Sequence, residues 1–252
     1  MTAAAYIGID PTAGLRAMTY AVLDERLRVV ALGEGGLDEV LDVALSYPHA
    51  MCGVDAPLGR NRGLLTDLAY REHVGLDDGD TYRTYRVCEY ELRRRGIYVY
   101  NTPEEEDSLA SWMVESRRLY AGLLAGGYAV WPTDGSRQMF ETYPHGAFTA
   151  LAGRRPYPKA GLEGRLQRQL ILYQAGINVP DPIRTLEEWT RYRLLRGELN
   201  LDRVRTHDEL DALVSAYTAY RLAEEPHNAV AAGDPSEGQI VLPVSELEDS
   251  YA

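Results

Sequence analysis

Two apolar segments of this sequence each end in an aspartate. Asp10 closes the run 6–10, and Asp55 follows the run 50–54. Open α/β sheets usually bind ligands at the carboxyl ends of their strands, so these two aspartates are the first candidates for a functional site. A proline follows each of them closely, so either residue alone could simply begin a turn. The occurrence of two such aspartates favours the functional interpretation.

A second pair of aspartates, Asp208 and Asp211, lies in a segment predicted to be helical. Their spacing of three residues places both on one helix face. Ser215 and Thr218 continue this face, and such small side chains would let the helix approach a sheet closely. The alternative is that Asp208 merely interacts with the helix dipole in the first turn.

Carboxylates from separate elements, with no His or Cys pair at ligand spacing, suit Mg²⁺ or Mn²⁺ rather than zinc. Two such ions can activate a water and stabilise the leaving oxygen of a phosphodiester. We therefore expect Asp10, Asp55, Asp208 and Asp211 to be metal ligands and catalytic residues. Glu141 could complete the set, although it could as easily pair with an arginine.

Other polar residues are candidates for substrate binding. Arg86 and Glu89 are predicted to line a substrate cleft, and Lys159 and Arg165 to contact phosphate, with a solvated surface position as the alternative for each. Several tyrosines could stack on bases or pack in the core: Tyr82, Tyr85, Tyr90, Tyr98 and Tyr100.

The apolar pattern predicts the elements that position these groups. The runs 6–10, 18–23 and 27–32 predict an antiparallel meander, with a turn at 11–14, and further strands are expected at 50–54, 138–142 and 239–242. Helices are expected from 37 to about 47, and at 108–124, 162–175, 186–195 and 206–222, the last beginning with a Thr206–Glu209 capping box. Together they predict one α/β domain over 1–252, with an insertion of short helices at about 60–103 and a loose acidic tail from about 245.

Composition restricts the partners. The chain has 252 residues, 45% of them hydrophobic, and a formal charge of −12, so attraction to nucleic acid must be local. Lys159 is the only lysine. The two cysteines, Cys52 and Cys88, form no disulfide framework or zinc motif, which favours a reducing, cytoplasmic location. Without a long apolar run, no membrane association is expected.

Several short motifs together resemble a known group of proteins. They are Gly8-Ile9-Asp10, Val54-Asp55-Ala56-Pro57-Leu58-Gly59, Arg86-x-Cys88-Glu89, Thr102-Pro103, Phe140-Glu141-Thr142-Tyr143-Pro144 and His207-Asp208-Glu209-Leu210-Asp211-Ala212. Their order resembles the RNase H-like superfamily, especially its Holliday-junction-resolvase branch, and more closely the family described as domain of unknown function 429.

This resemblance extends from Gly8 to about Pro243. It implies an RNase H-like α/β fold, with a mixed five-stranded sheet flanked by helices. It also implies a divalent-metal-dependent nuclease with Asp10, Asp55, Asp208 and Asp211 as ligands of Mg²⁺ or Mn²⁺. Resolvases that share the Asp-x-x-Asp helix more often carry Glu on the fourth strand. Asp55 has a shorter arm and would demand a tighter metal cage.

Two other functions remain open. A non-catalytic binding module could retain the scaffold without its metals. An actin-like ATP-using kinase also has a Gly-x-Asp first strand, but it needs two duplicated domains, and the sequence shows no repeat and no phosphate-binding glycine loop. The expected partner is a nucleic acid or nucleotide substrate, and association into a homo-oligomer is allowed.

Overall fold

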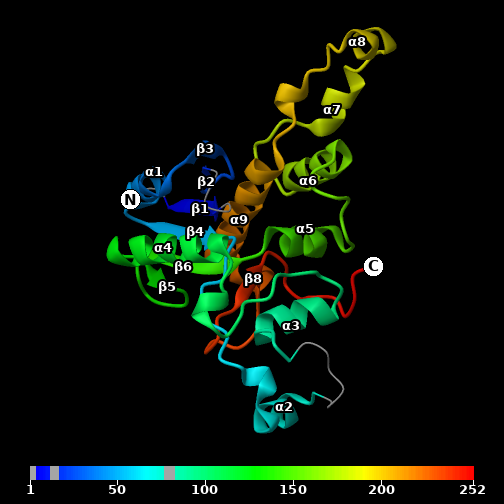
Figure 1. Cartoon of the computed structure of the whole chain (residues 1–252). Coiled ribbons are helices and arrows are strands. Elements are labelled where there is room, and N and C mark those ends of the chain that lie inside the picture. Colours follow the sequence, from blue (N-terminus) through cyan, green and yellow to red (C-terminus); the bar gives the residue numbers. More distant parts are fainter. Residues whose placement is uncertain (1–3, 12–16, 77–82) are drawn as a thin grey trace.

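The computed structural model describes residues 4–11, 17–76 and 83–252. Most of the turn expected at 11–14, together with Tyr82, lies outside the described residues. Within the described part, eight strands form one mixed sheet in the order β3-β2-β1-β4-β6-β8-β7, with β5 also paired to β6 (Figure 1). The strands are β1 (Ala5–Asp10), β2 (Met18–Leu23), β3 (Val29–Gly35), β4 (Ala50–Val54), β5 (Ala129–Val130), β6 (Arg137–Thr142), β7 (Val230–Ala232) and β8 (Ile240–Leu242).

The pairing confirms the expected meander and brings three strand ends together. β1 pairs antiparallel with β2, and β2 with β3. β1, β4 and β6 are parallel, with Ile9 opposite Val54 and Val54 opposite Glu141. Their carboxyl ends therefore lie at one edge of the sheet. The sheet exceeds the five strands expected because β5 pairs with the first half of β6, and β8 with its second half.

Helices cover both faces of this sheet (Figure 1). One apolar core joins α1 and α4 to inward residues such as Ile7 and Ile9. The other joins α5, α6 and α9 to the opposite face, where Tyr6 lies. Successive residues of β1 point to opposite faces of the sheet, as the two-residue period of a strand requires. The α-helices of the described chain are α1 (Leu37–Leu45), α2 (Leu68–Val74), α3 (Val87–Arg94), α4 (Ser111–Ala125), α5 (Pro144–Ala152), α6 (Leu162–Gln174), α7 (Pro182–Glu187), α8 (Arg191–Arg196) and α9 (His207–Glu224).

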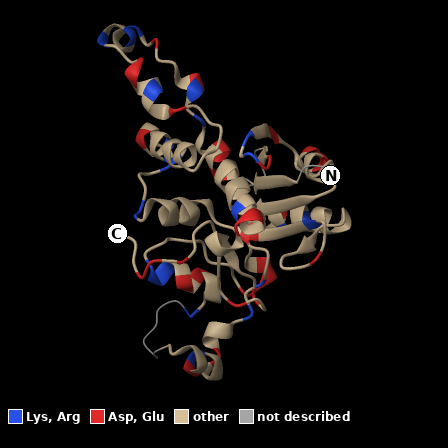
Figure 2. Ribbon diagram, turned by 180° about the vertical axis from the view of Figure 1, so that it is seen from behind, with Lys and Arg blue, Asp and Glu red and all other residues tan. Residues whose placement is uncertain are grey.

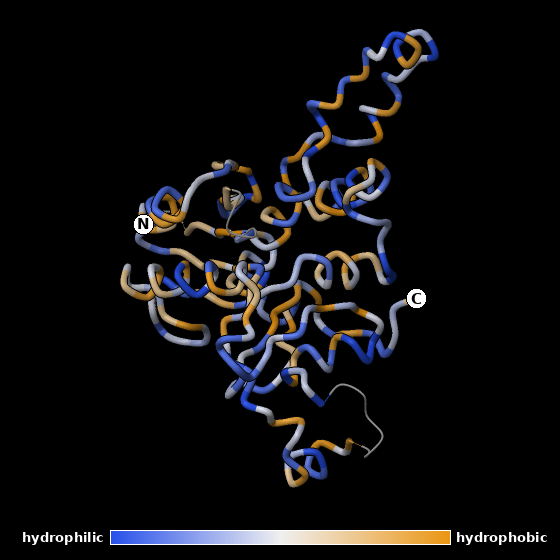
Figure 3. The backbone as a smooth tube through the Cα atoms, viewed as in Figure 1, coloured by the Kyte–Doolittle hydropathy of each residue, from blue (hydrophilic) through white to orange (hydrophobic). Residues whose placement is uncertain are grey.

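The prediction of one helix at 186–195 is wrong. Two short helices, α7 and α8, occupy this region and project from the body of the protein (Figure 1). The break has a local cause, because the Thr190 hydroxyl accepts a hydrogen bond from Arg193 N at 3.2 Å and begins a new helix. Hydrophobic and charged residues alternate along this projection (Figures 2 and 3). None of the described helices is both long and apolar enough to cross a membrane.

The segment from Ser245 is not loose as expected. Tyr251 is only 3% exposed, its backbone N–H donates to Arg95 O at 2.8 Å, and Ala252 O accepts from Arg155 N at 3.1 Å. A buried aromatic ring and these backbone bonds fix this segment beside α3. The insertion at 60–103 does contain short helices, α2 and α3.

Helix α9 lies directly against the sheet because the strands beneath it carry glycine. A Cβ at Gly8 would lie 2.0 Å from Ala212 O and 2.4 Å from Ala216 N. A Cβ at Gly53, which is opposite Gly8 in the pairing of β1 with β4, would lie 2.9 Å from Ser215 O of α9. The expected close approach of this helix is therefore confirmed. The sheet also contributes small residues to the contact, which the helix face alone does not indicate.

We expect Gly8→Ala to lower the free energy of unfolding by about 3 kcal/mol, because the new methyl group meets helix backbone that has no free space to move into. Urea denaturation followed by circular dichroism measures this. Gly36→Ala is the matched control, since a Cβ there meets nothing within 4 Å, and it should cost less than about 1 kcal/mol. Equal losses in the two variants would show that the contact between β1 and α9 is not tight.

Candidate active site

Three of the predicted aspartates lie together at the carboxyl edge of the sheet. Asp10 ends β1, and Asp55 directly follows β4, where its backbone N–H donates to Ile9 O at 2.9 Å. Asp211 reaches this edge from the second turn of α9. Asp10 and Asp211 are 9% and 2% exposed, and Asp55 is half-buried. Three separate elements therefore deliver carboxylates to one place.

Burial raises the pKa of all three carboxyl groups, and neighbouring negative charges add to this at Asp10 and Asp55. Burial raises the pKa of Asp10 to about 7, and the negative charge of Asp211 is the next cause. Burial, followed by the charges of Asp10 and Asp211, holds the pKa of Asp55 well above its ordinary value. In the described part of the chain, Asp10 and Asp55 form no ion pair and accept no side-chain hydrogen bond. Among the described residues, the three carboxyl groups therefore have one ion-paired cation, Lys159, which pairs with Asp211.

Lys159, the only lysine, supplies a cation to this site. Its Nζ lies 2.6 Å from Asp211 Oδ2, and its side chain is 47% exposed while that of Asp211 is 3% exposed. Burial alone would lower the pKa of Lys159, but the charge and hydrogen bond of Asp211, together with the charges of Asp10 and Asp55, outweigh this and raise it. Lys159 precedes α6 as predicted, and the structure places its ammonium group beside a candidate metal ligand.

Asp208 lies at the rim of the cluster. Its side chain is 24% exposed, and one carboxylate oxygen lies 2.7 Å from His207 Nδ1. The charge of Asp208 contributes to the raised pKa of Asp10, after burial and Asp211. Asp208 is thus close enough to influence the other carboxylates, but it is less enclosed than they are.

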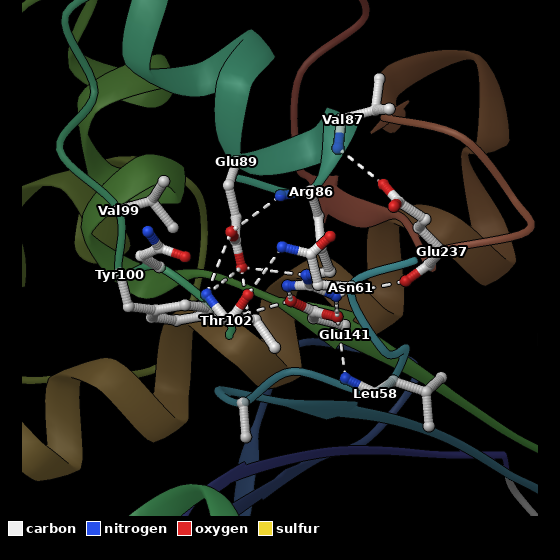
Figure 4. A network of polar contacts seen from close by, with 12 residues as sticks. Leu58, Asn61, Arg86, Val87, Glu89, Val99, Tyr100, Thr102, Glu141 and Glu237 are labelled. Carbon is white, nitrogen blue, oxygen red and sulfur yellow. Dashed lines mark hydrogen bonds and ion pairs between the residues drawn. The ribbon is translucent and has the colours of Figure 1, made fainter. Parts of the chain in front are cut away.

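Glu141 belongs to a separate, saturated network, and the structure supports the arginine pairing rather than a metal role (Figure 4). Its carboxylate accepts hydrogen bonds from Arg86 Nη1 at 2.9 Å, Arg86 Nη2 at 2.6 Å, Leu58 N at 2.8 Å and the Tyr100 hydroxyl at 2.8 Å. Four donors occupy the lone pairs that a metal ion would need.

Arg86 and Glu89 do not line a cleft, and they are not on the surface either. Both side chains are 0% exposed, and Arg86 Nε lies 2.9 Å from Glu89 Oε1. Glu89 also accepts from the backbone N–H of Thr102 at 3.2 Å. Sequence reasoning overlooked Glu237, a buried acid that accepts from Val87 N at 3.0 Å and so links α3 to the segment before β8. The network fixes the insertion to the sheet.

Arg165 is also placed differently from the prediction. Its Nε donates to Arg205 O and its Nη2 to Val204 O, both at 2.7 Å. These bonds hold the chain just before α9, so the guanidinium positions the helix that carries Asp211. Both of its bonded nitrogens are thus used within the protein rather than turned toward a phosphate.

Arg168, one helical turn further along α6, was not predicted but does face the site. It is 2% exposed, and Nη1 donates to Tyr157 O at 2.7 Å and Gly164 O at 3.1 Å. Its Nε has no hydrogen-bond partner. No spacing in the sequence distinguishes Arg168 from Arg165, so only the rotation of the folded helix reveals which of them faces the cleft.

Two clefts meet at the aspartates. The first, of about 440 Å³, is called the cationic cleft, and the residues of its lining that bear on function are Asp55, Tyr143, His145, Arg155, Lys159, Arg168 and Asp211. The second, of about 230 Å³, is called the aromatic cleft and is lined by Asp10, Pro11, Asp55, Tyr100, Trp112 and Tyr143. Asp55 and Tyr143 line both. Burial lowers the pKa of His145 to about 4, so its imidazole is neutral at pH 7.

In the absence of divalent ions, we expect Asp10→Asn to stabilise the protein at pH 8 but not at pH 4. Folding raises the pKa of Asp10 from 3.8 to about 7, so the folded state binds more protons than the unfolded state between these values. Stability is therefore lost as pH rises through this window. Above it, the wild type should be less stable than the variant by roughly 2–4 kcal/mol.

Thermal and urea unfolding with EDTA at both pH values test this expectation. Asp134→Asn, a substitution in an exposed loop, is the control and should behave like the wild type at both. The same stability difference for Asp10→Asn at pH 4 and pH 8 would contradict the interpretation.

Arg86→Met should lower the free energy of unfolding by about 3–5 kcal/mol, because Glu89 and Glu141 would keep buried charges without their common cation. The control is Arg117→Met, since Arg117 pairs at 2.9 Å with Glu106, whose side chain is 53% exposed. That change should cost less than about 1 kcal/mol. Denaturant titration compares the two, and a similar small loss in both would show that the network adds little.

Comparison with known proteins gives a family but no activity. A stretch of 95 residues is 39% identical to part of the DNA-directed RNA polymerase subunit beta of Caldicellulosiruptor bescii, and equally to that of Caldicellulosiruptor saccharolyticus. Each match covers 35% of this chain and only 8% of the polymerase subunit. No solved structure matches the chain. The family described as "Protein of unknown function (DUF429)" matches residues 8–236, and the chain therefore belongs to the DUF429 family.

Proposed function

We propose that this protein is a divalent-metal-dependent phosphodiester hydrolase, a nuclease or nucleotide hydrolase with an RNase H-like fold. The observation that carries the proposal is the meeting of Asp10, Asp55 and Asp211 at two open clefts. Each carboxyl has a raised pKa even though the charge of Lys159 acts on all three, and Asp10 and Asp55 form no ion pair within the described part of the chain. Such a cluster attracts a cation.

The donor set suits Mg²⁺ or Mn²⁺, because it consists of carboxylate oxygens alone. The ammonium group of Lys159 already acts as a cation beside Asp211. Among the described residues, no group of three or more His, Cys, Asp or Glu side chains is already arranged to hold a metal ion. Metal binding would therefore require Asp10, Asp55 and Asp211 to rearrange. A bound ion would activate water and stabilise the leaving oxygen.

The other residues of the cationic cleft would bind the substrate. Lys159 and Arg168 would neutralise phosphate charge, which the protein as a whole cannot attract because its net charge is −12. His145, neutral at pH 7, would add no charge but could exchange a hydrogen bond. Local cations would thus compensate for an acidic surface.

The order of the elements also supports an RNase H-like arrangement. An aspartate-ended first strand leads into a hairpin, an acid follows β4, and α9 carries the Asp-x-x-Asp pair against β1. The short strands β5, β7 and β8 extend the sheet beyond the five strands that the resemblance implies. Both cysteines are free and buried, which agrees with a proposed cytoplasmic location.

A non-catalytic binding module is the second candidate, and the Lys159–Asp211 ion pair favours it. This pair satisfies Asp211 within the protein at 2.6 Å. If the ammonium group permanently replaces a metal ion, the clefts would bind a ligand without cleaving it. The two functions differ in whether ions bind to the aspartates.

Calorimetric titration of Mn²⁺ and Mg²⁺ tests the proposal. The wild type should bind one or two ions, and the Asp10→Asn, Asp211→Asn double variant should lose at least about 10–100-fold in affinity. An Asp134→Asn, Asp202→Asn double variant in exposed segments controls for the change in net charge. Equal weak binding to all three proteins would reject the metal site and favour the binding module.

Cleavage is then measured with DNA, RNA and nucleotide substrates in each metal. The hydrolase should cleave at least one of them in Mg²⁺ or Mn²⁺, and Asp10→Asn should abolish that activity. A complete absence of cleavage across the panel would reject the hydrolase even if ions bind.

A further inference from the structure

Four aromatic rings form a row that connects the two clefts. The Tyr100 ring lies edge-to-face on Trp112, with ring centres 5.2 Å apart, and on Tyr143 at 5.6 Å. Tyr143 in turn lies edge-to-face on His145 at 6.0 Å. The row begins in the aromatic cleft beside Asp10 and ends in the cationic cleft.

Two of these rings are held by their hydroxyl groups. Tyr100 donates to the saturated carboxylate of Glu141 at 2.8 Å, and Tyr143 donates to the carbonyl of Tyr98. Trp112, Tyr100 and Tyr143 are only half-buried. The polar ends are thus fixed in the protein, while part of each ring remains accessible to a planar apolar group.

The far end of the row lies in the same cleft as a buried cation, Arg168. Arg168 is 2% exposed, and it forms no ion pair within 4 Å in the part of the chain that the structure describes. A guanidinium this buried is ordinarily paired with a carboxylate or a phosphate. Arg168 lines the cationic cleft together with Lys159 and Arg155, and these three cations suit the cleft to an anion.

We propose that the substrate of this site is an unpaired nucleotide, with its base on the aromatic row and its phosphate in the cationic cleft. This inference rests on the proposed function, and it adds the substrate class. Base–aromatic stacking accepts any base, while lysine and arginine bind the phosphate. Asp55 lines both clefts, so in this arrangement it lies beside the bond that joins the nucleoside to its phosphate.

The dimensions and charge exclude a duplex as the preferred ligand. Clefts of about 440 and 230 Å³ suit one small molecule or one extruded nucleotide. Duplex binding depends on many phosphate contacts over a basic surface, whereas this chain has a net charge of −12. A free nucleotide and an unpaired nucleotide within a strand share the required chemistry.

Binding is measured by fluorescence anisotropy of a labelled single-stranded hexathymidylate with phosphorothioate linkages, in EDTA. The absence of metal separates this test from the proposed hydrolysis. We expect Trp112→Ala to weaken binding about 5- to 100-fold, the loss of one stacked base, and Trp112→Phe to retain most of the affinity. Tyr192→Ala is the matched aromatic control, since Tyr192 lies 63% exposed on the projecting α8, and it should bind like the wild type.

The cationic end is tested with Arg168→Gln and, because a buried arginine also serves folding, with the exposed Arg155→Gln. Both should weaken binding and reduce its salt dependence. Thymidine monophosphate is used as a competitor. Competition at concentrations near those of the oligonucleotide supports a free nucleotide, and much weaker competition supports an unpaired nucleotide in a strand.

A duplex of the same sequence should bind at least about 10-fold more weakly, because its bases cannot reach the row without unpairing. Duplex binding equal to single-strand binding, or wild-type affinity in Trp112→Ala, would overturn the inference. Strand binding that depends on Trp112, together with no carboxylate-dependent ion binding, would reject the hydrolase while leaving the nucleotide site standing.

Discussion

The contact of α9 with β1 and β4 is the constraint on which the rest of the structure depends. Gly8 and Gly53 remove the side chains that would hold the helix away from the sheet. Because α9 packs this closely on the sheet, Asp211 in its second turn comes beside the aspartates at the ends of β1 and β4. Hydrogen bonds from Arg165 to the carbonyls just before α9 then fix where the helix begins. The position of the carboxylates thus follows from backbone packing.

Two acidic clusters lie side by side in this protein and differ in how they are satisfied. Around Arg86, each carboxylate meets donors of matching number and geometry, which is how a buried polar network stabilises a fold. Within the described residues, Asp10 and Asp55 accept no side-chain hydrogen bond, and burial raises their pKa values. Tyr100 links the two clusters, because its hydroxyl belongs to the first while its ring lines the cleft of the second. The rigid cluster supports the one that remains open to ligands.

Local patterns predicted what depends on local physics. The meander, the start of α1, the limits of β4 and the capping box of α9 follow from periodicity and from hydrogen bonds within a few residues. The gathering of Asp10, Asp55 and Asp211 also followed, because strand ends and one helix face determine it. Their roles as metal ligands and catalytic residues stay predictions.

Long-range pairing could not be predicted in the same way. Nothing near Glu141 in the sequence indicates that Arg86 will reach it from the insertion, or that Glu237 will bind the start of α3. Arg165 and Arg168 differ only in the direction each side chain takes once α6 has docked. The tail after Ser245 is acidic, and its packing depends on one buried ring, Tyr251.

The separation of β1 and α9 along the chain has a consequence for synthesis on the ribosome. β1, β2 and β3 are neighbours along the chain, and they leave the ribosome well before α9 does. Until then the face around Tyr6 and Gly8 lacks its cover, and a nascent sheet exposed in this way is prone to wrong contacts. The same order means that the three aspartates cannot meet before α9 has left the ribosome.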